Sequence, residues 1–141
     1  MSHFQTIVTG HGKFATGFKG AIELLAGKQD TMTFVDFSES MNELDLGKKL
    51  SELVKDDSVL IFTDLAGGTP YKEAAKIAFN NPKVKVVAGC NLASLLETAF
   101  NEYETLEAYA NDLVKVTCQS AEVLDLSDSD DEKEEPEDDG I

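Results

Sequence analysis

Residues 59–70 read VLIFTDLAGGTP, an apolar and β-branched run that ends in an aspartate and a glycine-bearing turn. Its first five residues are typical of a central strand covered on both faces. Residues 5–12, QTIVTGHG, repeat this layout, with an apolar strand that ends in a glycine turn around His11. A helical pattern follows each turn. The two stretches together predict a parallel sheet whose strands alternate with helices.

The remaining segments alternate in the same way. A glycine at position 27 marks the end of the first helix. Ser40-Met41-Asn42-Glu43 resembles a capping box that opens the second helix. Thr69 and Pro70 suit the N-cap and first position of the third. Helices are expected over 14–26, 41–54, 70–80, 92–100 and 105–118, and further strands over 31–37 and 84–88, with a last edge-type strand over 122–126.

This order predicts an α/β fold with a doubly wound, mainly parallel four-stranded sheet and helices on both faces. In the flavodoxin-like order 2-1-3-4, the first and third strands are central neighbours. The helices that follow them go to opposite faces, and ligands bind in the crevice between those strand ends. His11 and Asp64 both fall at this crevice.

Composition limits the classes of function. The formal net charge is −15, and the segment from Asp125 to Ile141 holds ten acidic residues and one lysine. We expect one globular domain over 1–126 and a disordered acidic tail over 127–141. Nucleic-acid binding is not expected, because it needs clustered cations. Without an apolar run of about 18 residues or a basic-then-apolar leader, we expect a soluble, cytoplasmic protein with no membrane insertion.

The cysteine, histidine and arginine counts narrow the chemistry further. Cys90 and Cys118 lack metal or redox spacing, and both are expected to be buried. With only two histidines and no paired cysteines, neither a metal site nor a cofactor is expected. The chain contains no arginine, so a site that grips phosphate through guanidinium groups is excluded.

His11 is the first candidate for chemistry, because glycines on both sides leave its ring open. Asp64 either caps the turn or accepts a hydrogen bond from one imidazole nitrogen, which leaves the other nitrogen as a nucleophile. Gly67, Gly68 and Thr69 either form an ordinary turn or present N–H groups and a hydroxyl to an anion. The alternative for His11 is a turn residue without a role, and His3 is taken as inert.

A competing motif overlaps the first turn. Residues 10–15, GHGKFA, fit the GxGxxG/A dinucleotide fingerprint, and Asp36 follows at about the required distance. A histidine next to the first glycine would crowd the pyrophosphate, however, and the second glycine turn would have no purpose. Hydrolysis by a Ser-His-Asp triad is disfavoured because no GxSxG elbow is present.

Three motifs in order resemble those of one family. They are Gly10-His11-Gly12 before a helix, DLAGGTP over 64–70, and AGCNL over 88–92. Together they are similar to the mannose-family enzyme IIA of the bacterial phosphoenolpyruvate:sugar phosphotransferase system (PTS). The resemblance spans roughly residues 5–126, and the acidic tail departs from it.

The resemblance implies a phosphoryl relay, in which the carrier HPr is the donor and an EIIB component is the acceptor. His11 would be phosphorylated on Nε2 while Asp64 holds the other nitrogen, and Thr69 would help to bind the phosphoryl group with Gly67 and Gly68. It also implies a homodimer in which the strand over 122–126 crosses to the partner's sheet. That segment otherwise pairs with its own sheet or is frayed.

Two other functions stay open at this point. One is a related phosphoryl donor domain for a dihydroxyacetone kinase, although the GGTP turn is closer to the transporter branch. The other is a dinucleotide-binding or regulatory module without catalysis. The sugar itself is not encoded in these motifs.

Overall fold

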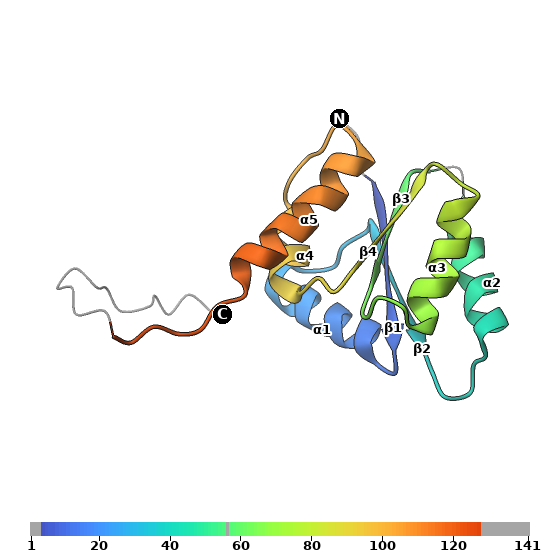
Figure 1. Ribbon diagram of the computed structural model, residues 1–141, viewed down its shortest axis with the longest axis horizontal. Helices are drawn as coiled ribbons and strands as arrows, with labels where there is room; N and C mark the ends of the chain where they lie inside the picture. The colour runs from blue at the N-terminus through green and yellow to red at the C-terminus, as the bar shows by residue number, and fades with distance from the viewer. Residues whose placement is uncertain (1–3, 56, 128–141) are drawn as a thin grey trace.

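The computed structural model describes residues 4–55 and 57–127 of the chain. These residues form a three-layer α/β fold with one sheet between two layers of helices (Figure 1). Strands and helices alternate up to α4, and α5 then follows α4 directly. The elements are β1 Gln5–His11, α1 Phe14–Ala26, β2 Met32–Phe37, α2 Glu43–Leu53, β3 Val59–Thr63, α3 Thr69–Phe79, β4 Val84–Ala88, α4 Leu92–Ala99 and α5 Leu106–Ser120.

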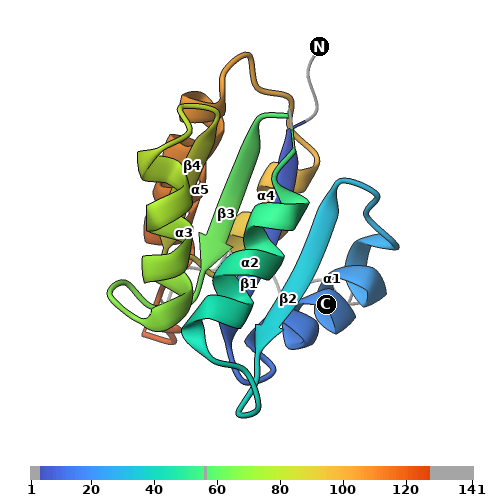
Figure 2. The ribbon, with the colours of Figure 1, turned by 90° about the vertical axis from the view of Figure 1, so that its right-hand side faces the viewer.

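The sheet has the predicted order, β2-β1-β3-β4, and all three pairings are parallel. Helices α2 and α3 cover one face, and α1, α4 and α5 cover the other (Figure 2). In the register, Thr9 of β1 lies opposite Thr63 of β3, and His11 lies opposite Phe37 of β2. The carboxyl ends of the two central strands therefore meet at one edge of the sheet, as predicted.

Alternation along the central strands divides the core into two clusters. Val8 and Phe62 face the layer of α1, α4 and α5, whereas Ile7 and Ile61 face α2 and α3. All four are buried, with at most 2% of their surface exposed. The sheet is thus anchored on both faces, and its carboxyl edge is a rigid platform for side chains.

Two helix starts differ from the sequence-based expectation. The N-cap of α2 is Asn42 rather than Ser40, and it forms a reciprocal capping box with Asp45 at distances of 2.8 and 3.1 Å. Ser40 instead bonds the hydroxyl of Ser38. The N-cap of α3 is Gly68, so Thr69 is the first helical residue and not the cap. Both corrections shift a boundary by one or two residues and leave the elements unchanged.

Helix α5 runs two residues beyond its predicted end, and Ser120 accepts a hydrogen bond from the Asn91 side chain at 2.9 Å. Cys118 lies on the exposed side of this helix, so the expectation that it is buried was wrong, whereas Cys90 is buried as predicted. Residues 121–127 form neither helix nor strand, so the predicted strand over 122–126 does not pair with its own sheet. Its exchange with a second chain stays a prediction.

One glycine makes room for a buried charge between α2 and α3. A Cβ on Gly47 would lie 2.5 Å from Oε1 of Glu73, whose side chain is 7% exposed. The other carboxylate oxygen of Glu73 accepts a hydrogen bond from Lys76 Nζ at 2.9 Å. Glycine inside a helix costs roughly 0.5–1 kcal/mol relative to alanine. At this position it allows the carboxylate to fit between the two helices.

Among the helices of residues 4–55 and 57–127, none is long and apolar enough to cross a membrane. His3 and most of the expected acidic tail lie outside the described residues. The expected division between a domain over 1–126 and a tail over 127–141 therefore stays a prediction.

Candidate phosphoryl-transfer site

His11 and Asp64 come together at the carboxyl edge of the sheet. His11 is the last residue of β1, and Asp64 directly follows β3, the neighbouring strand. The His11 side chain is 46% exposed, whereas that of Asp64 is 14% exposed. The His11 ring thus faces solvent beside a more buried carboxylate, and the two side chains lie together as the strand ends predicted.

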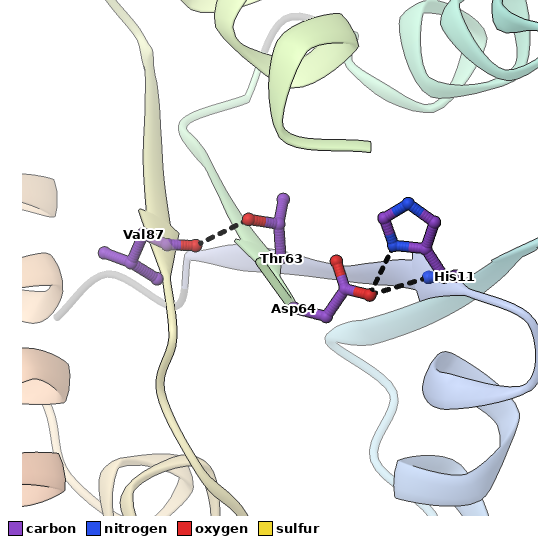
Figure 3. A network of polar contacts seen from close by, with 4 residues as sticks. All are labelled: His11, Thr63, Asp64 and Val87. Atoms are coloured by element: carbon purple, nitrogen blue, oxygen red, sulfur yellow. Dashed lines mark hydrogen bonds and ion pairs between the residues drawn. The ribbon is translucent and has the colours of Figure 1, made fainter. Parts of the chain in front are cut away.

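A single carboxylate oxygen of Asp64 holds His11 at two points (Figure 3). Oδ2 accepts a hydrogen bond from the His11 backbone N–H at 2.8 Å and lies 2.8 Å from Nδ1 of the ring. An ionised carboxylate can only accept hydrogen bonds, so Nδ1 is the donor of this bond and carries a proton. In this tautomer Nε2 keeps its lone pair and can act as a nucleophile.

The environment keeps Asp64 ionised. Burial raises the pKa of its carboxyl, but the hydrogen bonds from the His11 backbone and ring and the attraction of the ring outweigh burial and hold this pKa below the ordinary value of 3.8. Asp64 therefore carries its negative charge at neutral pH. A positive charge that develops on the imidazole is stabilised by this neighbour.

Gly68 borders the reactive edge of the ring. A Cβ at this position would lie 2.7 Å from Cε1 of His11 and 3.4 Å from Nε2. Gly68 is also the N-cap of α3, and no side chain forms a capping bond there within the described part of the chain. The nucleophilic nitrogen consequently lies next to a helix N-terminus, where backbone N–H groups and the helix dipole favour an anion.

The N-terminus of α1, which follows β1 at the same edge of the sheet, is already occupied. Asp36 accepts a hydrogen bond from the Thr16 backbone N–H at 3.0 Å and another from its hydroxyl at 2.8 Å. This carboxylate supplies the negative charge that the first turn of α1 favours. Between these two helices, α3 alone offers an open N-terminus beside His11. Asp36 is also the acidic residue of the dinucleotide fingerprint, and both of its carboxylate oxygens are engaged in these bonds.

The structure places the other predicted residues around this centre. Gly67 adopts φ +88°, a conformation that favours glycine and that turns the chain into Gly68 and α3. Thr69 opens α3 one residue after the contact with the ring. Within residues 4–55 and 57–127, no cluster of three or more His, Cys, Asp or Glu side chains suits a metal ion.

Two contacts of the site were not predicted from the sequence. A Cβ on Gly10 would lie 2.9 Å from Cγ of Asp64 and would also overlap the Phe14 ring, so glycine is needed there for close packing. Phe37 lies against His11, with ring centroids 6.0 Å apart and planes at 72°. The position of Phe37 at the end of a predicted neighbouring strand was the available signal.

Comparison with known proteins identifies the family of this chain. The EIIA-man family model, described as "PTS system fructose IIA component", matches residues 5–117. A fructose-specific EIIA component of Bacillus subtilis is 30% identical over 124 residues, which cover 84% of this chain and 85% of that protein. A sorbose-specific EIIA component of Lacticaseibacillus casei is 35% identical over 100 residues, 69% of this chain and 72% of the relative.

Solved structures have the same fold. An EIIA component from Streptococcus agalactiae superposes with a TM-score of 0.81 at 26% identity and covers 89% of this chain and 98% of its own. A mannose/sorbose-specific IIA subunit from Enterococcus faecalis reaches a TM-score of 0.84 at 24% identity, with 90% and 98% covered. The chain therefore belongs to the EIIA-man family and is an EIIA component of a sugar phosphotransferase system, a class of phosphotransferase that relays phosphoryl groups from HPr to EIIB.

Proposed function

We propose that His11 is the phosphoryl-carrying residue of this relay and that Nε2 is the atom that is phosphorylated. The observation that carries the proposal is the 2.8 Å contact between Nδ1 and Asp64, which leaves Nε2 free beside the N-cap of α3. Nucleophile, orienting carboxylate and anion-binding amides are thereby combined at one edge of the sheet.

The transfer balances without an external acid or base. The Nε2 lone pair forms the new P–N bond while the P–N bond of the donor's phosphohistidine breaks, and its electron pair returns to the donor ring. The proton stays on Nδ1 of His11, so the ring gains a positive charge that Asp64 offsets. Passage to EIIB runs the same step in the opposite direction. Positioning and electrostatics supply most of the catalysis.

The turn after β3 takes the role that arginine has in many phosphate sites. Gly67 presents its backbone N–H to the oxygens of the phosphoryl group, and Thr69 adds a hydroxyl donor. Gly68, whose own N–H donates to the Leu65 carbonyl at 3.1 Å, brings the N-terminus of α3 beside the ring. This assignment agrees with the lack of arginine in the chain. The relatives described above are named for fructose and sorbose, so these hexoses are the first substrates to test with the complete transport system.

A homodimer with an exchanged C-terminal strand is part of the proposal. Strand β4 is an edge strand of the described sheet, and a groove of about 420 Å³ runs along it between α3 and α5. Val123, Leu124 and Leu126 are at least 75% exposed in the segment that follows α5. An exposed apolar segment and an open strand edge suit each other across two chains. We place this dimer in the cytoplasm.

Intact mass after incubation with phosphoenolpyruvate, enzyme I and HPr tests the role of His11. A gain of about 80 Da that is lost in acid is expected for the wild type and absent for His11→Ala. His3→Ala is the matched control, because it removes the other histidine of the chain and should keep the gain. Labelling that persists in His11→Ala would assign the phosphoryl group to another residue.

A further inference from the structure

We propose that Phe37 is a positioning residue for His11, a role that rests on the proposed function of His11. Strand β1 lies between β3 and β2, so the His11 ring has a neighbour on each side. Asp64, after β3, holds Nδ1 from one side. Phe37, the last residue of β2, lies against the ring from the other side.

Phe37 contacts the turn at His11 in two independent ways. Its ring packs against the imidazole in an edge-to-face arrangement, with centroids 6.0 Å apart and planes at 72°. Its carbonyl oxygen accepts a hydrogen bond from the Gly12 backbone N–H at 2.9 Å, and these two residues form an isolated bridge. The end of β2 therefore restrains both the ring of His11 and the backbone that follows it.

The residue before Phe37 anchors this support. The Asp36 carboxylate bonds the backbone and hydroxyl of Thr16, which ties the end of β2 to the first turn of α1. Phe37 also packs on the buried cluster that includes Val35 and Leu46. Its ring is thus fixed from behind and gives the imidazole a firm surface.

The hydrogen bond to Asp64 restrains only Nδ1, so by itself it would let the ring rotate about that contact. Gly68 limits movement at the Cε1 edge, and Phe37 limits it on the β2 side. Phosphoryl transfer needs Nε2 to stay in line with the incoming phosphorus, and small misplacement lowers the rate. Loss of the aromatic contact should therefore slow transfer while the fold persists.

The test is the rate of phosphoryl transfer from phospho-HPr to Phe37→Leu. The interaction free energy of an edge-to-face aromatic pair corresponds to a factor of about 2 to 10 in an equilibrium or rate constant. We therefore expect the rate of phosphoryl transfer to Phe37→Leu to be lower than that of the wild type by about this factor. Phe37→Tyr keeps the ring and should restore the wild-type rate. Phe79→Leu, the same change at an 89% exposed position on α3, should leave the rate unchanged. Thermal melting establishes that each variant is folded at the assay temperature.

Each outcome bears on the proposal. Phe37→Leu at the wild-type rate would overturn it, as would equal slowing of the Leu and Tyr variants. If Phe37→Leu melts below the assay temperature, Phe37→Met provides the same comparison with an unbranched side chain. A wild-type protein that takes no phosphoryl group would instead refute the function of His11, so the two failures are distinguishable.

Discussion

Gly68 sets the space available to the His11 ring. Alanine fits the backbone there, since φ is −79° and ψ is 173°, but its Cβ would lie 2.7 Å from Cε1 of His11. We predict that Gly68→Ala displaces the ring and lowers the rate of phosphoryl acceptance by on the order of 10- to 100-fold. Melting should stay close to that of the wild type, because the clash is relieved at an exposed side chain.

The neighbouring glycine provides the matched control. A Cβ on Gly67 would meet nothing within 4 Å, but its φ of +88° is unfavourable for alanine. Gly67→Ala should therefore lower the free energy of unfolding by about 1 kcal/mol. Stopped-flow transfer and thermal denaturation of both variants separate these effects. A Gly68→Ala protein that accepts the phosphoryl group at the wild-type rate would contradict a close contact between residue 68 and the ring.

The ionisation of Asp64 makes the free energy of unfolding depend on pH. Its pKa in the folded state lies below the ordinary 3.8, so its ionised form stabilises the fold above that value. This contribution is lost as the pH falls through the lowered pKa. We predict that the difference in unfolding free energy between wild type and Asp64→Asn is constant near neutrality and shrinks below about pH 4. Urea denaturation at several pH values measures it, and a difference that grows in acid would contradict the assignment.

At this scale the sequence predicted the pair but not its surroundings. His11 and Asp64 follow adjacent parallel strands, so strand order alone brings them together. The contacts of Gly68 and Phe37 with the ring depend on how three separate elements pack, and composition and periodicity carry no signal for such distances.

At the scale of elements, the start of α2 distinguishes two candidate caps. Asn42 accepts from the Asp45 backbone, whereas the Ser40 hydroxyl is engaged only with Ser38. We predict that Asn42→Ala lowers the free energy of unfolding by about 1 kcal/mol, because the capping bond is lost. Ser40→Ala should change it by less than about 0.5 kcal/mol. Chemical denaturation measures both, and a larger effect at Ser40 would refute the observed cap.

This comparison also explains why element boundaries were harder to predict than the elements. Ser40 and Asn42 are both good N-cap residues, and an acidic residue follows each three positions later. The choice depends on a turn in which the Met41 backbone N–H donates to the Ser38 carbonyl. The strands and helices themselves follow from hydrophobic periodicity over many residues, which one misplaced cap does not disturb.

At the scale of the whole molecule, the C-terminal segment should determine the oligomeric state. If residues 122–126 pair with β4 of a second chain, a protein that ends at Ala121 should be a monomer of less than 15.3 kDa. A protein that ends at Ser127 keeps the segment and lacks most of the acidic tail, so it should remain a dimer. Sedimentation velocity measures both. A dimer of the protein that ends at Ala121 would assign the contact to other surfaces.

The glycine at position 47 limits which side chains α2 and α3 can carry where they face each other. Alanine there would favour the helix, yet its methyl group would collide with the buried Glu73 carboxylate. Alanine at position 47 would therefore favour α2 most in a protein that has a shorter side chain at position 73, so the two helices constrain each other's substitutions.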